Sequence, residues 1–204
     1  MDKRTLWVGF VSFLFLGVVA VVTLLFAGPA GFRGTTYDEP FPAAPEMVLT
    51  REDGSSFRLS EMRGKIVLLF FGYTSCPDIC PTTMAELNSA LQNLEEDEVQ
   101  QVQVLFVTVD PERDTHERAQ EYVNHFNKSF IGLSGTQAEL EKVWKDYGIF
   151  REIVPGASAA GYLVNHTARV TLIDRQENLR VSFGFEMSVE DIVHDLKLVL
   201  RERE

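Results

Sequence analysis

The sequence predicts an α/β fold in which helices cover a mostly parallel sheet. Two continuous apolar runs, 65–71 (KIVLLFF) and 102–110 (VQVLFVTVD), have the composition of strands that are buried on both faces. Helical patterns follow each of these runs, so the strands are joined by crossovers and lie parallel. Two further strands, 168–174 and 179–185, are separated only by the turn-like RQEN and therefore close the sheet as an antiparallel pair.

The other elements are assigned from local signals. Asp53-Gly54 lies between two short extended segments and indicates an N-terminal hairpin. Helices are predicted over 81–97, 115–127, 136–148 and 188–202, because each segment carries apolar residues at helical spacing. The segment 136–148 also opens with a capping box, Thr136 to Glu139. No period is present in 149–167, which we expect to be irregular.

The order of these elements is hairpin, strand, helix, strand, helix, helix, strand, strand, helix. This is the order of a thioredoxin-like fold with an N-terminal β-hairpin and an additional helix. In open sheets of this type, chemistry takes place beyond the carboxyl ends of the parallel strands. The residues that follow the strand 65–71 are therefore the first place to look for a site.

The N-terminal region is organised differently from this domain. Residues 6–26 carry no charge and are numerous enough to span a bilayer as one transmembrane helix, while Lys3 and Arg4 precede them. We therefore predict a membrane anchor at 1–27, with a cytoplasmic N-terminus and the remaining chain on the extracytoplasmic side of the cell membrane. A cleaved signal peptide is the alternative, disfavoured because its apolar region is usually shorter. A Gly/Pro-rich linker at 28–45 then leads to the domain at 46–204.

Charge and cysteine content narrow the possible functions. The net charge of −11 argues against nucleic acid as a partner. The two cysteines, Cys76 and Cys80, are separated by three residues in the stretch FFGYTSCPDICPTT. A disulfide at this spacing closes a very short loop, so a purely structural bridge is the weakest explanation. A redox pair and two ligands for one metal ion remain.

From their setting in the sequence, both thiols are expected to be reactive. Pro81 suits the first turn of the helix that follows, so Cys80 is expected at or near the helix start. Free amides and the positive end of the helix dipole stabilise a thiolate there. Two thiolates suit Cu(I), and a third ligand would also allow Cu(II) to be held.

A histidine is the natural third ligand. His116, His125 and His194 lie within helical patterns and are expected on helix surfaces. His166 differs, because it directly precedes the strand at 168–174, a junction that lies beside the cysteine-bearing helix start in a thioredoxin-like topology. Thioredoxins carry a proline at this place, whereas Asn165-His166-Thr167 contains none.

Three stretches of the domain resemble a known family. FFGYTSCPDICPTTM, VTVDPERDT and YLVNHTARV, in this order and approximate spacing, are similar to the Sco/SenC family of copper-binding assembly factors of cytochrome c oxidase. The resemblance covers essentially the whole predicted domain, and an N-terminal membrane anchor is also typical of that family.

The resemblance implies a ligand set and a function. Cys76, Cys80 and His166 would bind the copper ion, as Cu(I) or Cu(II), and the recipient would be subunit II of cytochrome c oxidase. Other copper chaperones or thiol reductants would be further partners. Asp110 would support the site or dock a partner, or else cap the turn before Pro111. A metallochaperone is favoured over an enzyme, and a thiol–disulfide oxidoreductase that uses the same two cysteines is the alternative.

Asp78 lies between the two cysteines, and its role is argued from the residues alone. It could tune the charge around the ligands or cap the following helix. Capping is the role we expect, because Asp is among the residues preferred at a helix start.

Overall fold

The computed structural model describes residues 31–156, 161–185 and 187–202. The chain divides into two compact units, Met1–Gly31 and Phe32–Glu204, and the second is the one described below. Within the described ranges, no helix has both the length and the apolar character that a membrane span requires. The transmembrane helix predicted at 6–26 lies outside these ranges.

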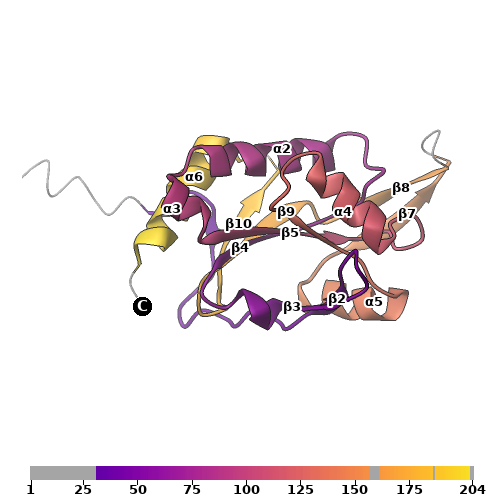
Figure 1. The fold of residues 1–204 in the computed structure, drawn as a ribbon, viewed down its shortest axis with the longest axis horizontal. Coiled ribbons are helices and arrows are strands. Elements are labelled where there is room, and N and C mark those ends of the chain that lie inside the picture. Colours follow the sequence, from indigo (N-terminus) through magenta and orange to yellow (C-terminus); the bar gives the residue numbers. More distant parts are fainter. Residues whose placement is uncertain (1–30, 157–160, 186, 203–204) are drawn as a thin grey trace, which may run out of the picture. The chain divides into compact units, whose positions relative to one another are not determined.

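A six-stranded sheet forms the centre of the unit, in the order β1-β10-β9-β4-β5-β6 (Figure 1). Its strands are β1 (Thr35–Thr36), β4 (Ile66–Gly72), β5 (Val102–Thr108), β6 (Ile131–Leu133), β9 (Arg169–Ile173) and β10 (Leu179–Gly184). Strands β4, β5 and β6 are parallel, whereas β9 is antiparallel to both β4 and β10. The predicted α/β fold, with its parallel core and closing antiparallel pair, is confirmed.

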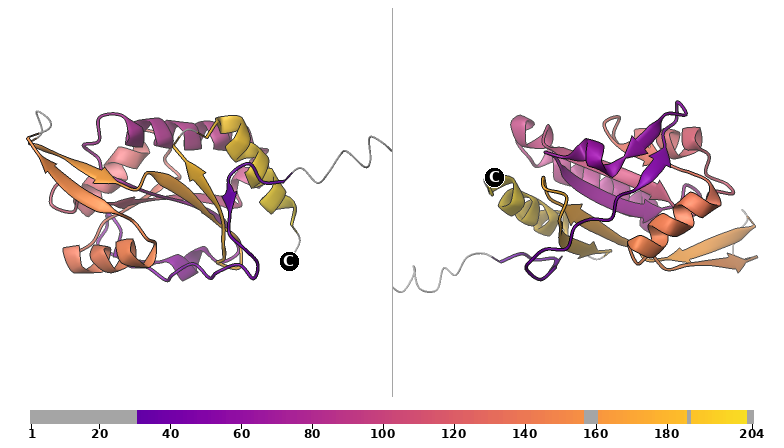
Figure 2. Two further views of the ribbon diagram at one scale, coloured as in Figure 1. Left: turned by 180° about the vertical axis from the view of Figure 1, so that it is seen from behind. Right: turned by 90° about the horizontal axis from the view of Figure 1, so that it is seen from below.

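Helices and a hairpin cover the two faces of the sheet. Helices α2 (Ile79–Gln92) and α6 (Val189–Arg201) lie on one face, and α5 (Gln137–Asp146) lies on the other with the hairpin of β2 (Val48–Thr50) and β3 (Ser56–Arg58) (Figures 1 and 2). The remaining helices are η1 (Leu59–Met62), α3 (Glu96–Val99) and α4 (His116–Asn124), the last packed on β5 and β6. Because both faces are covered, all seven residues of β4 are buried.

The helix termini follow the capping signals in the sequence. Thr136 accepts a hydrogen bond from the Glu139 amide, and the Glu139 carboxylate accepts one from the Thr136 amide, as the capping box predicts. The Asp53-Gly54 turn lies between β2 and β3, with Gly54 at φ +80°, a conformation that favours glycine.

Two regions differ from the prediction. The segment 149–167, expected to be irregular, contains an antiparallel hairpin of β7 (Arg151–Pro155) and β8 (Tyr162–His166). Strand β6 was also missed, because three residues that include Gly132 are too short to show an apolar period. The hairpin was missed because exposed residues of β7, such as Glu152 and Ile153, hide the alternation of a half-buried strand.

The predicted linker at 28–45 is described from residue 31, and its described part folds onto the domain. Strand β1 pairs with β10, and the backbone amides of Arg33 and Gly34 donate to the buried carboxylate of Asp195 in α6. Further along, the Tyr147 hydroxyl donates to the carbonyl of Pro45 at 2.6 Å. From Phe32 onward the chain is thus part of the folded unit, where we had expected a tether.

Candidate metal centre

The two cysteines lie at the carboxyl end of β4, where the fold predicts them. Cys76 is half-buried in the loop between β4 and α2, and Cys80 is fully buried as the second residue of α2. Gly72, the last residue of β4, allows this close approach, because a Cβ there would lie 3.1 Å from the Cys80 sulfur and 2.8 Å from a ring carbon of Phe70. The backbone thus leaves room for the sulfur directly beneath the helix start.

His166, the last residue of β8, reaches the same place from a distant part of the chain. Its Nε2 lies 3.6 Å from the Cys80 sulfur. The ring stands edge-on to Tyr73, with centroids 5.8 Å apart and planes at 86°. Its Nδ1 lies 3.1 Å from the Thr167 carbonyl oxygen. Since a carbonyl only accepts, Nδ1 is the donor in this contact, and Nε2 is the ring nitrogen that faces the cysteines.

The electrostatics of the two thiols are opposite. The Cys80 amide donates to the Cys76 sulfur at 3.3 Å. A hydrogen bond from the Cys80 side chain, together with the His166 side chain and the backbone amides of Asp78 and Cys80, lowers the pKa of Cys76 to about 4 against the effect of burial. The hydrogen bond to Cys76 and then burial raise the pKa of Cys80 above its ordinary value. Cys76 is therefore the thiolate and Cys80 the protonated partner.

A cleft of about 400 Å³ opens beside the site. Its lining includes Cys76 and His166 but not Cys80, and the rest of its wall is largely apolar, with Ile79, Leu163 and Phe150 among the contributors. Phe150 is 61% exposed, the largest value among the exposed large apolar side chains of the described residues. The cleft is thus an open approach to two of the three predicted ligands.

The two acidic residues singled out from the sequence have different outcomes. Asp78 is the N-cap residue of α2, but its side chain makes no capping hydrogen bond, so the expected capping role is wrong. It contributes instead through its backbone amide, which lowers the pKa of Cys76. Asp110 is fully buried just after β5 and accepts hydrogen bonds from Arg113 Nε at 2.5 Å and the Tyr162 hydroxyl at 2.8 Å.

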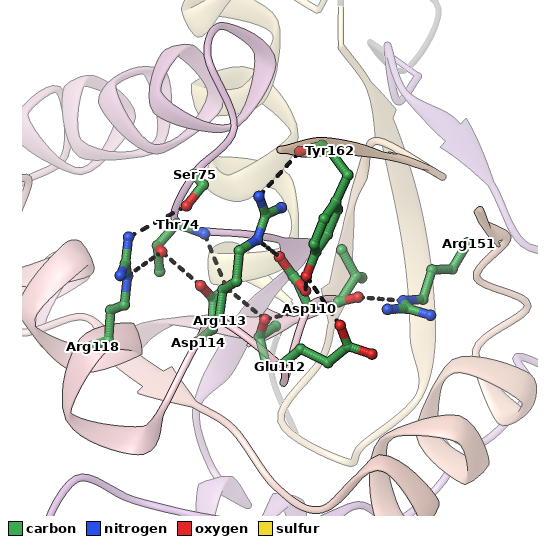
Figure 3. Close-up of polar contacts among 11 residues, drawn as sticks. Thr74, Ser75, Asp110, Glu112, Arg113, Asp114, Arg118, Arg151 and Tyr162 are labelled. Atoms are coloured by element: carbon green, nitrogen blue, oxygen red, sulfur yellow. Dashed lines mark hydrogen bonds and ion pairs between the residues drawn. The ribbon is translucent and has the colours of Figure 1, made fainter. Parts of the chain in front are cut away.

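Several residues around the site were missed from the sequence. Asp114 is fully buried and accepts hydrogen bonds from the amide and the hydroxyl of Thr74, two residues before Cys76 (Figure 3). Arg113 lies over the ring of Tyr162 at 3.6 Å from its centroid, at the start of β8. The signal was present in the stretch DPERDT, from which we had drawn only Asp110.

The chemistry of the donors fits a soft metal ion. Two sulfurs and one imidazole nitrogen suit copper better than a hard, oxygen-preferring cation. Among the described residues, no group of three His, Cys, Asp or Glu side chains already surrounds a metal position. The two cysteines are not joined to each other by a disulfide here. The other three histidines do not line the cleft; His125, for example, is exposed at the end of α4.

Comparisons with known proteins agree with this picture. The SCO1/SenC family matches residues 35–201. A SCO2-like protein of Rickettsia felis is 29% identical over 202 residues, which cover 97% of this chain and 98% of that one. The solution structure of apo Sco1 from Thermus thermophilus has a TM-score of 0.75 and 36% identity, with 84% of this chain and 99% of that chain covered. The structure of Bradyrhizobium japonicum ScoI with copper bound has a TM-score of 0.69 and 34% identity, covering 77% and 99%.

Proposed function

This chain belongs to the SCO1/SenC family, and on that premise we propose that it is a membrane-anchored copper chaperone of the extracytoplasmic side. It binds one copper ion through Cys76, Cys80 and His166. It then passes the ion to the binuclear copper centre of cytochrome c oxidase subunit II. The observation that carries the proposal is the 3.6 Å approach of His166 Nε2 to the Cys80 sulfur, across 86 residues of sequence.

Three further observations support it. The Sco family is one of cytochrome c oxidase assembly proteins, and a relative of 34% identity has been solved with copper bound. Because the Cys76 sulfur is already ionised, it can bind a metal ion without first releasing a proton. The open cleft at Cys76 and His166 gives a recipient access to the ion through shared ligands.

Membrane attachment is part of the proposal. The uncharged run 6–26 with Lys3 and Arg4 before it supports a single span with the domain outside the cytoplasm. Alkaline extraction of membranes would test it, because an integral span keeps the chain in the lipid pellet. Release of the intact chain into the soluble fraction would contradict the anchor.

Copper titration of the full-length chain in detergent tests the ligand set. One equivalent of Cu(I) should compete successfully with a chromophoric chelator, and His166→Ala, Cys76→Ser and Cys80→Ser should each lower the affinity at least tenfold. His125→Ala is the matched control, since His125 is exposed at the C-cap of α4 and its ring contacts the Glu121 carbonyl, outside the cleft lining. Unchanged affinity and copper spectra in His166→Ala would overturn the three-ligand site.

Delivery is tested with the recipient itself. The copper-loaded chain is mixed with the metal-free copper domain of oxidase subunit II, and the visible spectrum of the binuclear centre is followed. We expect that spectrum to develop with the wild-type chain and to be lost with Cys76→Ser. Equal metallation by free copper at the same concentration would contradict a chaperone role.

The pair of free cysteines, of which Cys76 is only half-buried, favours one second candidate, a thiol–disulfide oxidoreductase. The half-buried Cys76 thiolate would attack a partner's disulfide, form a mixed disulfide and release one partner thiolate. Cys80 would then lose its proton and attack the Cys76 sulfur, which leaves a Cys76–Cys80 disulfide and a reduced partner. Rapid reduction of a disulfide substrate by His166→Ala without copper would favour this candidate over the chaperone.

A further inference from the structure

The turn between β5 and α4, residues 108–114, contacts both segments that carry the predicted ligands (Figure 3). We propose that Asp110 and Asp114 in this turn are positioning residues that together set the separation between the thiol ligands and the imidazole ligand. Asp114 fixes the loop that bears Cys76, and Asp110 fixes the strand that ends at His166. The inference rests on the proposed function, because only a metal site gives this separation a role. The contacts themselves are present without any metal.

Asp114 fastens the cysteine loop with both of its carboxylate oxygens. Oδ2 accepts hydrogen bonds from the Thr74 amide at 2.9 Å and the Thr108 hydroxyl at 2.7 Å, and Oδ1 accepts one from the Thr74 hydroxyl at 2.6 Å. The carboxylate is fully buried, so each of these bonds acts with little competition from water. The chain is therefore held two residues before Cys76.

A cation from α4 completes this attachment. Arg118 donates from Nε to the Thr74 hydroxyl oxygen at 2.8 Å and from an Nη to the Ser75 hydroxyl at 3.3 Å. The Thr74 hydroxyl thus accepts from Arg118 while it donates to Asp114, which leaves it one orientation. Residues 74 and 75 are held from the α4 side, and Cys76 follows directly.

Asp110 performs the corresponding task for β8. It pairs with Arg113, and its Oδ1 accepts from the Tyr162 hydroxyl at 2.8 Å. Arg113 stacks on the Tyr162 ring and donates to the Tyr162 backbone carbonyl at 3.0 Å, so ring and backbone are held together. Tyr162 begins β8 and His166 ends it, so the strand that positions the imidazole is fixed at its first residue.

One buried hydroxyl joins the two halves. Thr108 donates to Asp114 and accepts from the Asp110 amide at 2.9 Å, and its side chain is fully buried. The two carboxylates are therefore held at a fixed distance from each other. Since each carboxylate holds one ligand-bearing segment, this one turn sets the distance between the cysteines and His166. The cysteine loop and β8 share no backbone pairing in the sheet and meet directly at Tyr73, whose ring contacts His166. The turn joins them a second time, through buried polar groups.

Amide hydrogen exchange on the full-length, metal-free chain tests the positioning. In Asp114→Asn, one acceptor oxygen becomes a donor, and we expect about tenfold faster exchange in the peptide covering 73–79. In Asp110→Asn, the acceleration should instead fall on 162–166. Asp195→Asn is the matched control, a fully buried carboxylate that binds the amides of Arg33 and Gly34 and should loosen only that segment.

Copper affinity is the second measurement, because a residue that only stabilised the fold would leave it unchanged. Asp114→Asn and Asp110→Asn should each weaken Cu(I) binding about tenfold, while Asp195→Asn stays within twofold of wild type. If Asp114→Asn does not fold, Thr74→Val replaces it and should show the same two effects in smaller measure. Thr74→Ser keeps the hydroxyl and should behave as wild type.

The outcomes separate this inference from the proposed function. Uniform acceleration of exchange across the whole chain in Asp114→Asn, with no larger effect in 73–79, would overturn the positioning role. So would wild-type copper affinity in a variant whose cysteine loop exchanges faster. If the wild-type chain itself binds no copper, the proposed function is wrong. The local exchange pattern would still decide whether the turn holds the two segments in place.

Discussion

The depressed pKa of Cys76 leads to a specific prediction about its reactivity toward an alkylating reagent. A free cysteine has a pKa near 8.5, so its alkylation rate rises about tenfold per pH unit below that value. Cys76, with a pKa of about 4, is already a thiolate throughout the range from pH 5.5 to pH 8. Its alkylation rate should therefore be almost flat over that range.

The magnitude can be worked out for pH 6. A thiol of pKa 8.5 is ionised there to roughly 0.3%, so Cys76 holds about 300 times more thiolate than an ordinary cysteine. A thiolate of lower pKa is also a weaker nucleophile, and with a Brønsted coefficient of about 0.45 over 4.5 units this costs about 100-fold. The two effects nearly cancel in the absolute rate. The shape of the pH profile, and not the rate at one pH, is the quantity to measure.

The assay uses reduced, metal-free chain and iodoacetamide, with the modified cysteine identified by mass spectrometry. Cys80→Ala should restore most of the pH dependence, because the hydrogen bond from Cys80 is the largest cause of the low pKa. His166→Ala should restore less, since the side chain of His166 lowers the pKa by a smaller amount. The wild-type chain unfolded in guanidinium serves as the reference for an ordinary thiol.

A clear result would refute the reasoning. If alkylation of Cys76 in the folded chain rises tenfold per pH unit between pH 6 and pH 8, the thiolate is not stabilised by its neighbours. A flat profile that persists in Cys80→Ala would show that another group is responsible. In that case the assignment of thiolate and thiol within the pair would have to be revised.

Three further predictions concern stability and are read from denaturant unfolding curves. Gly72→Ala should lower the free energy of unfolding by about 1–3 kcal/mol, because its Cβ would lie 2.8 and 2.9 Å from aromatic carbons and would also crowd the Cys80 sulfur. An unchanged unfolding midpoint would mean that the end of β4 can shift without cost. Arg180→Met should cost about 3 kcal/mol, because it strips the cation from the buried Asp174 carboxylate, and a neutral effect would show that the other donors to Asp174 suffice. Thr136→Ala should cost about 1 kcal/mol through loss of the α5 cap, with the same loss expected in thermal melts.

Much of the fold could be predicted because its core strands are long and buried on both faces. β4 and β5 are seven-residue, largely apolar strands that no helical pattern matches. Once they are assigned as strands, the helical segment between them must be a crossover connection. β6 has three residues and β7 alternates poorly, so neither carries a pattern that a single sequence reveals. Short or exposed strands depend on partners far along the chain, and that information is not local.

The candidate site was predictable in its donors but not in its supports. Two closely spaced cysteines at a helix start, together with a histidine just before a core strand, are unusual enough to stand out in the sequence. The structure brings two of these three side chains, Cys80 and His166, together. Asp114 is different, because an aspartate in a turn is usually solvated and caps a helix. Only its burial and its bonds to Thr74 distinguish it, and both arise from tertiary packing.

The unequal depth of the two sulfurs has a consequence for how an ion would leave the site. Cys80 is fully buried and does not line the cleft, whereas Cys76 and His166 do. If the three residues bind copper as proposed, an incoming ligand from a recipient would replace Cys76 or His166 first, while Cys80 still held the ion from behind. The last bond to break would be the one farthest from solvent, so release would require a recipient that had already engaged the ion. Depth would thus act as a safeguard against loss of copper to water, and it would make transfer sequential.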